Sequence, residues 1–237
     1  MAIYVLVHGA WGGSYGFRVV RRLLGAAGHE VLTPSLTGIG ERSHLTGPQV
    51  NLSLHVRDVV NVVRYDDLDD IVLLGFSYGG MVVTGACEHI GERVRELVYL
   101  DAFVPDDGDS VESLTNGALG RTDTAIDAPW SVPASPREFE DPAVAARSNP
   151  RRCAQPMGTL TERLRVSVPV EQRPLGRTYI RATADPNGAA FDAPAARARS
   201  SPAWRYHEIA TTHMIPENRP EELTGLLVAL AHRTSEP

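Results

Sequence analysis

Lysine is absent from this chain, cysteine is nearly so, and aromatic residues are few. All 23 basic residues among the 237 are arginines, while phenylalanine, tryptophan and tyrosine together make up 6% of the sequence. The lack of lysine excludes it as a catalytic group. Acidic residues outnumber basic ones, and the formal net charge of −6 argues against nucleic acid or an anionic membrane as a partner.

Long apolar runs are also missing. No stretch approaches the roughly 20 apolar residues of a membrane span. No basic segment precedes the first apolar run at residues 3–7, so we expect no signal peptide. The only thiols, Cys87 and Cys153, fit a reducing compartment, although the sequence leaves a disulfide between them open. A cytoplasmic protein without membrane association is therefore expected.

What the chain does contain is an alternation of short β-branched runs with amphipathic helical patterns, which is typical of a parallel sheet with crossover helices. Strands are predicted at residues 3–7, 30–33, 71–75, 97–100, 178–182 and 205–209. Helices are predicted at residues 15–27, 54–65, 78–90, 193–199 and 220–232. A chain of 237 residues suits one α/β domain of this kind.

Residues 105–170 interrupt this alternation. Prolines break the region into short pieces, at positions 129, 133, 136, 142, 150, 156 and 169. Because a long insertion in a compact domain is usually a lid or a binding loop, we expect a single domain over residues 1–237 with a cap of short helices at about 105–170 above the active site. A loosely ordered linker is the alternative. The acidic runs at 66–70 and 106–109 are expected to be solvated loops and not a metal site.

The most informative motif is Gly75-Phe76-Ser77-Tyr78-Gly79, which follows the apolar run of residues 71–74. It is typical of a nucleophile elbow, a sharp strand-to-helix turn that holds a serine in a strained conformation and needs small residues on both sides of it. A helical pattern begins directly behind the motif. The sequence therefore predicts Ser77 as a nucleophile; an ordinary tight turn between a strand and a helix is the alternative.

A serine nucleophile needs a base, and the base needs an anionic partner that holds its tautomer. His213 fits the first role best among the eight histidines, because it follows the last predicted strand and active groups in such sheets lie beyond the carboxyl ends of strands. Asp185, which follows the strand at 178–182, is our first choice for the acid. Asp101, at the end of the strand at 97–100, is the substitute.

Ester hydrolysis also requires hydrogen-bond donors for the oxyanion. The Tyr78 amide, directly after the nucleophile, is one candidate. We assign the second to the Ala10 amide in the loop of residues 8–13, where glycines let the backbone approach a substrate closely. A phosphate loop is the competing interpretation, but this loop lacks a complete G-x-G-x-x-G and a lysine.

Four segments together resemble the α/β-hydrolase superfamily: residues 8–11, 75–81, 99–105 and 212–214. Over nearly its whole length, and most weakly in the cap, the chain is similar to the compact branch that contains plant methyl-ester esterases, hydroxynitrile lyases and related bacterial esterases. The resemblance implies an α/β-hydrolase fold, with six mostly parallel strands flanked by helices and a small helical cap. It also implies no cofactor and a Ser77–His213–Asp185 triad, and it is compatible with a homodimer.

The resemblance further places a substrate pocket between the cap and the elbow. Candidate lining residues are Trp11, Tyr78, Phe103 and Trp130, for each of which core packing is at least as good an explanation. Phe76 belongs to the same wall. Many relatives have histidine at the Phe76 position, so this wall should be more apolar here.

The sequence thus predicts a serine hydrolase that acts on carboxylic esters of small molecules through an acyl-enzyme. Lyases of the branch carry threonine where Gly9 stands and lysine where Met214 follows the histidine, so both positions favour an esterase. The main alternative is a secondary-metabolite tailoring enzyme on the same fold, such as a cyclase, dehydratase, lactonase or thioesterase. A non-enzymatic small-molecule receptor is a third hypothesis, which an intact triad disfavours.

Overall fold

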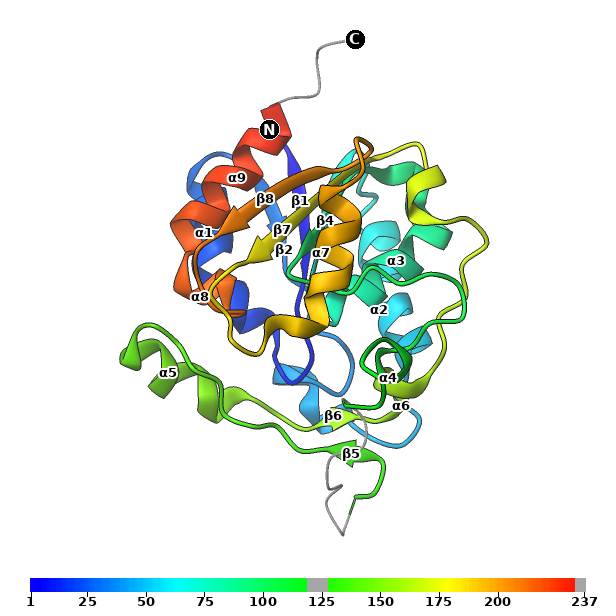
Figure 1. Cartoon of the computed structure of the whole chain (residues 1–237), viewed down its shortest axis with the longest axis vertical. Coiled ribbons are helices and arrows are strands. Elements are labelled where there is room, and N and C mark those ends of the chain that lie inside the picture. Colours follow the sequence, from blue (N-terminus) through cyan, green and yellow to red (C-terminus); the bar gives the residue numbers. More distant parts are fainter. Residues whose placement is uncertain (119–127, 233–237) are drawn as a thin grey trace.

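The computed structural model describes residues 1–118 and 128–232 of the chain. A six-stranded sheet lies at its centre, in the order β2-β1-β3-β4-β7-β8, with every neighbouring pair parallel (Figure 1). Its strands are β1 Ile3–Val7, β2 Glu30–Leu32, β3 Ile71–Phe76, β4 Val94–Leu100, β7 Gly176–Ala182 and β8 Arg205–Ile209. The predicted six-stranded parallel sheet is confirmed.

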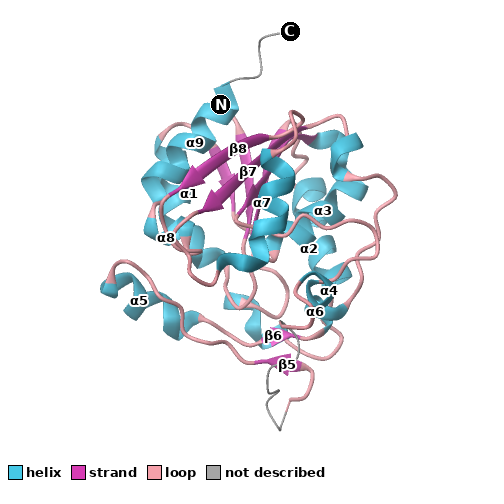
Figure 2. Cartoon of the chain, in the orientation of Figure 1, coloured by secondary structure: helices cyan, strands magenta, loops and turns pink. Residues whose placement is uncertain are grey.

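Helices cover both faces of this sheet (Figure 2). One face carries α2 Leu52–Tyr65, α3 Gly79–Ile90 and α7 Asp192–Arg199, and the other carries α1 Arg18–Ala26 and α9 Pro220–His232. A short helix, α8 Ile215–Asn218, joins β8 to α9. Within the two described ranges, no helix is both long and apolar enough to cross a membrane.

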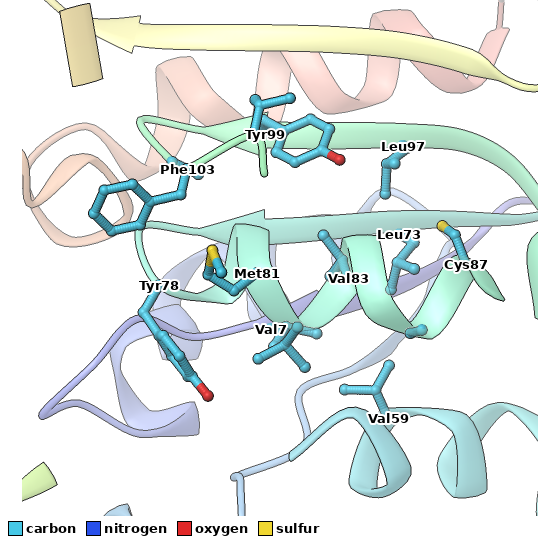
Figure 3. Close-up of a cluster of buried hydrophobic side chains, with 14 of the residues drawn as sticks. Val7, Val59, Leu73, Tyr78, Met81, Val83, Cys87, Leu97, Tyr99 and Phe103 are labelled. Atoms are coloured by element: carbon cyan, nitrogen blue, oxygen red, sulfur yellow. The ribbon is translucent and has the colours of Figure 1, made fainter. Parts of the chain in front are cut away.

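The sheet divides the hydrophobic core into two layers, because successive side chains of a strand point to opposite faces. Along β3, Ile71 and Leu73 belong to the layer under α2 and α3, whereas Val72 and Leu74 belong to the layer under α1 and α9. Figure 3 shows the first layer, where strand side chains meet those of α2 and α3: Val7, Leu73, Leu97, Tyr99, Val59, Met81, Val83 and Cys87. This packing fixes α3 against the sheet and so fixes the turn between β3 and α3.

Over its described residues, the predicted cap lies mostly on the side of the molecule where the strands end (Figure 1), and its last residues return along α3, where the Ser167 amide donates to Glu88. It contains α4 Val111–Leu114, α5 Pro142–Ser148 and α6 Gly158–Thr161, as well as an antiparallel pair, β5 Ser131–Val132 and β6 Gln155–Pro156. Short helices were expected here, whereas the antiparallel pair was not. Residues 119–127 of the predicted cap lie outside the described residues.

Short 3₁₀ helices connect the larger elements. They are η1 Ser14–Phe17, η2 Gly40–Leu45, η3 Gly91–Arg93, η4 Asn149–Arg151, η5 Val170–Gln172 and η6 Gly188–Phe191.

Candidate active site

A cavity of about 590 Å³ opens between the carboxyl ends of the strands and the cap. Ser77, His213 and Asp185 line it from the sheet side, together with residues 8–13 of the loop after β1. The cap contributes Leu114, Arg137, Phe139, Ser148 and Arg152. The cavity therefore lies where the sequence predicts the active site.

Ser77 stands on a sharp turn between β3 and α3. Its φ of 57° lies in the left-handed region, which costs a residue other than glycine on the order of 1–3 kcal/mol. Main-chain hydrogen bonds hold the turn: the Ser77 amide donates to the Leu100 carbonyl at 3.2 Å, and the Ser77 carbonyl accepts from the Phe103 amide at 3.3 Å. A Cβ on Gly75 would lie 2.6 Å from the Gly79 carbonyl oxygen, so strand and helix approach too closely for a side chain there. This is the geometry that the motif predicts.

His213 follows β8, and its imidazole is fixed by a hydrogen bond and two aromatic rings. Nδ1 lies 2.6 Å from Oδ2 of Asp101. The ring stacks on Phe191 with 4.8 Å between centroids and 9° between planes, and Phe76 lies at the same centroid distance with 31° between planes. In the part of the chain that the structure describes, Nε2 has no hydrogen-bond partner. This nitrogen is therefore available to a group in the cavity that His213 and Ser77 both line.

Asp101 directly follows β4 and lies in the left-handed region, with φ at 41°, and its side chain is completely buried. Oδ2 accepts from His213, while Oδ1 accepts from the Ala182 amide at 3.2 Å and from Nη1 of Arg181 at 2.5 Å. Arg181 also donates to Asp192 at 2.7 Å. A buried carboxylate needs hydrogen bonds and a paired charge to offset its lost hydration. Asp101 has both.

The carboxylate beside His213 is thus Asp101 and not Asp185, which corrects the first choice made from the sequence. Asp185 follows β7 and lines the cavity, but its Oδ1 accepts from the Asn187 amide at 2.9 Å. Its carbonyl accepts from the Gly188 amide at 3.2 Å. These bonds close a local turn around the aspartate. The substitute named from the sequence is the residue that reaches the histidine.

The loop after β1 brings the Ala10 amide to the same cavity. A Cβ on Gly9 would lie 2.9 Å from Cβ of Ser77, so the loop can pass this close to the serine only with glycine there. Trp11 ties the loop to the cap, because its amide donates to Oε1 of Gln155 at 2.9 Å and its indole donates to the Val132 carbonyl at 3.0 Å. Among residues 1–118 and 128–232, no acceptor takes a hydrogen bond from the amide of Ala10 or from that of the residue after Ser77.

A model of the alpha/beta hydrolase family matches residues 4–225. This chain belongs to that family. The family match agrees with the resemblance that the motifs implied. It also agrees with the nucleophile turn, the strand order and the histidine after the last strand.

Several known proteins are similar to this α/β hydrolase. A carbendazim hydrolyzing esterase of Nocardioides sp. (strain SG-4G) is 52% identical over 119 residues, which are 50% of this chain and 49% of that protein. Methylesterase 1 of Arabidopsis thaliana is 28% identical over 114 residues, 44% of this chain and 40% of that protein. The chain thus matches half or less of the length of these relatives. A solved extracellular alpha/beta-hydrolase from a Paenibacillus species has a TM-score of 0.83 at 23% identity, over 97% of this chain and 98% of that one, and shares the fold.

The aromatic residues expected at the pocket divide into two groups. Trp11 and Phe76 line the cavity. Tyr78 and Phe103 are buried in the core beside α3 (Figure 3), and Trp130 is not among the described residues that line the cavity. Other aromatic rings reach the cavity from positions to which we assigned no role: Tyr15, Phe17, Phe139 and Phe191.

His8 supports the loop that carries the Ala10 amide. Its Nε2 accepts from the Leu36 amide at 3.1 Å, so Nδ1 carries the proton and donates to the Gly9 carbonyl at 2.8 Å. Burial lowers the pKa of His8, which favours this neutral form. The histidine therefore positions the loop and is not a second base.

His55 lies behind the residue that follows the nucleophile, and the sequence analysis assigned it no role. Its Nε2 donates to the Thr37 carbonyl at 2.8 Å, and its Nδ1 accepts from the Tyr78 hydroxyl at 2.9 Å. Burial lowers the pKa of His55 to about 4. The signal that could have found it is its spacing of four residues from Val59, on the buried stripe of α2.

Neither cysteine carries the chemistry of this site. Both are free thiols. Burial raises the pKa of Cys87 to about 12, so its thiol is not a nucleophile near neutral pH. Cys153 accepts a hydrogen bond from the Gly40 amide at 3.2 Å. Within the described ranges, no three histidine, cysteine, aspartate or glutamate side chains lie close enough together to hold a metal ion.

Proposed function

We propose that this protein hydrolyses carboxylic esters of small molecules through an acyl-enzyme on Ser77. Oγ attacks the ester carbonyl while Nε2 of His213 takes its proton. Asp101 accepts from Nδ1–H of His213, which holds the tautomer and stabilises the imidazolium that forms. The Ala10 and Tyr78 amides bind the oxyanion, and the imidazolium then protonates the departing alcohol. Water repeats the sequence on the acyl-enzyme and restores the serine.

The observation that carries this proposal is the 2.6 Å contact between the buried Asp101 and His213, at the wall of the cavity that Ser77 also lines. A carboxylate on Nδ1 requires the proton there in the neutral imidazole. Nε2 is then left as the basic nitrogen of a ring that lines the same cavity as Ser77. The names of the relatives, an esterase and a methylesterase, support the same class of reaction.

The surroundings of His213 favour hydrolysis over lyase chemistry. The next residue, Met214, is buried and lines the cavity, so no cation stands at that position. The guanidinium of Arg181 lies on the far oxygen of Asp101 and is already paired with it. Neither Met214 nor Arg181 therefore supplies a free cation that could stabilise a leaving group departing as an anion.

The test compares Ser77→Ala with Ser43→Ala, a change at an exposed serine. With 4-nitrophenyl butyrate, the first variant should lose about 10⁴-fold or more in kcat/KM, and the second should match the parent. A fluorophosphonate should add one phosphonyl mass to the parent and to Ser43→Ala but not to Ser77→Ala. Ester turnover by Ser77→Ala at the parent rate would contradict the proposal. Turnover of another substrate class without any serine adduct would favour the tailoring-enzyme alternative.

The location and the assembly belong to the proposal as well. Free thiols at Cys87 and Cys153 support the cytoplasmic location expected from the sequence, because thiols persist in reducing compartments. Cell fractionation tests this. The homodimer expected from the family resemblance is tested by light scattering on the eluate of a sizing column.

A further inference from the structure

The cap side of the cavity carries two arginines that the proposed reaction does not use. Arg137 and Arg152 both line the cavity, and both are half-buried. They come from the segment between β5 and β6, which lies across from the ends of the strands (Figure 1). Both arginines therefore bring a positive charge to the wall of the space that a substrate would occupy.

Hydrogen bonds hold both arginines in place without using the terminal nitrogens of their guanidinium groups. The Arg137 amide donates to Oδ1 of Asn149 at 2.8 Å, and its carbonyl accepts from Nδ2 of Asn149 at 3.0 Å. Nε of Arg152 donates to the Ser135 carbonyl at 3.0 Å. Across residues 1–118 and 128–232, no carboxylate pairs with either guanidinium. Two other partly buried arginines, Arg173 and Arg197, do have such partners, and so does the buried Arg181.

The charge around this pair favours an added anion. Burial lowers the pKa of Arg152, and the positive charge of Arg137 lowers it further. Glu217, which lines the same cavity, accepts from the Ser148 hydroxyl, and burial raises the pKa of its carboxyl group. Asp185 lines the sheet side and is engaged in its own turn. Two guanidinium charges on the cap side thus share the cavity wall with Asp185 and Glu217, and burial disfavours the charged form of Glu217.

We propose that Arg137 and Arg152 form an anion-binding subsite, and that the preferred substrates are esters that carry a separate carboxylate group. This inference rests on the proposed ester hydrolysis. A guanidinium binds a carboxylate through two parallel N–H···O bonds, with more directional specificity than an ammonium provides. Such a group would fill the free donors and relieve the repulsion between the two cations.

The test uses two series of 4-nitrophenyl esters with the same leaving group: monoesters of dicarboxylic acids with four to eight carbons, and esters of the uncharged monocarboxylic acids of equal length. The ratio of their kcat/KM values measures the preference for a carboxylate, after subtraction of spontaneous hydrolysis. The parent should prefer the charged ester at one or more lengths. Arg152→Gln and Arg137→Gln should each lower that ratio about tenfold, the effect of losing one charge-assisted contact.

Arg151→Gln is the matched control. Arg151 is exposed, precedes Arg152 in the chain and is not among the described residues that line the cavity, yet its substitution removes the same charge. It should leave the ratio within about twofold of the parent, because exposed charges are screened. Equal ratios in Arg151→Gln, Arg152→Gln and Arg137→Gln would overturn the subsite. So would a parent that prefers the uncharged ester at every length.

Two further readouts separate this subsite from the proposed function. Hydrolysis of the uncharged esters, in which the parent and Arg151→Gln should agree within about threefold, reports the ester chemistry alone. Calorimetric titration with the dicarboxylates themselves reports the subsite alone, even if no ester is turned over. The parent should bind at least one of them more tightly than Arg152→Gln does. Equal binding by the two proteins would contradict the subsite without touching the ester hydrolysis.

Discussion

At the carboxyl edge of the sheet, main-chain atoms of neighbouring strands hold Ser77 and Asp101, whereas in the cap a single side chain holds the backbone of Arg137 in the cavity wall. The Asp101 amide donates to the Ile180 carbonyl at 2.7 Å, so β7 itself places the aspartate. In the cap, the side chain of Asn149 holds both backbone groups of Arg137. One substitution at Asn149 can therefore release the backbone of Arg137, whereas no single side chain holds the backbones of Ser77 and Asp101.

This difference separates the reaction from the choice of substrate. An edge built by strand pairing keeps its geometry in any sequence that keeps the topology. A wall built from single side-chain bonds changes with each of them, as expected of a loop region carried on a rigid scaffold. We therefore expect changes at the edge to abolish activity, and changes in the cap to redistribute it among substrates.

The largest expected effect comes from the two candidate acids. Asp101→Asn should lower kcat/KM for uncharged esters about 10⁴-fold, because an amide at this position no longer holds the productive tautomer of His213. Asp185→Asn, the matched change after the neighbouring strand β7, should cost less than about tenfold, because its carboxylate caps a local turn. Steady-state kinetics on both variants, with thermal melting to verify folding, makes the comparison. A larger loss in Asp185→Asn would break the assignment of the acid.

A second pair of substitutions compares buried and exposed ion pairs. The side chains of Arg181 and Asp101 are 10% and 0% exposed, whereas those of Arg219 and Glu140, which link α8 to the cap, are 38% and 35% exposed. Arg181→Met should lower the free energy of unfolding by about 3–5 kcal/mol, since it strands a buried carboxylate. Arg219→Met should lower it by less than about 1 kcal/mol. Urea unfolding measures both, and equal losses would show that burial does not distinguish the two regions.

What could be predicted from the sequence also depends on whether a feature is set by a local motif or by distant contacts. Ser77 and His213 could be predicted because each is tied to a strand end by a local motif. The acid could not, because Asp101 and Asp185 both follow strands. The choice depends on the left-handed turn at Asp101, with φ at 41°, and on the partner that β7 supplies at Arg181. Asp101 and Arg181 are about 80 residues apart in the chain, so their contact leaves no local pattern in the sequence.

The sequence also could not predict a strand start that carries charged residues, or strands that are very short. β4 begins at Val94, three residues before its predicted start at 97, because Arg95 and Glu96 hide the strand pattern. Glu96 is buried only because Thr178 donates to it at 2.6 Å and Arg205 pairs with it, both from strands that are distant in sequence. The two-residue strands β5 and β6 are too short for any periodicity.

The contrast can also be sharpened with pH, because the edge buries neutral histidines and residues 105–170 contain no histidine. Burial lowers the pKa of His55 from 6.5 to about 4. Above pH 6.5 the His55 imidazole is unprotonated in both the folded and the unfolded chain. Between pH 6.5 and 4 only the unfolded chain binds the proton, so the free energy of unfolding falls as the pH falls. The loss should approach about 3 kcal/mol at pH 4 and then stop growing.

Urea unfolding between pH 7.5 and pH 4 measures this loss. His55→Gln should flatten the decline, whereas His44→Gln, at an exposed position, should leave it unchanged. Burial lowers the pKa of His8 as well, so part of the decline should persist in His55→Gln. An unchanged slope in His55→Gln would contradict the burial of a neutral imidazole under the elbow.

The smallest expected effect arises where the two regions meet, at Gln155. This buried cap residue accepts from the Trp11 amide, next to the proposed oxyanion donor at Ala10, and donates to Oγ1 of Thr159 at 2.6 Å. Gln155→Leu keeps the approximate volume and frees the loop, so kcat should fall about tenfold with little change in KM, because the oxyanion contact matters most in the transition state. Thr159→Val removes the other bond of Gln155, and with it the bond from the Thr159 hydroxyl to the Pro156 carbonyl, but it keeps the bond to Trp11 and should change kcat less than about threefold. If instead Gln155→Leu altered KM alone, the cap would act on substrate binding only, and the separation between edge and cap would be complete.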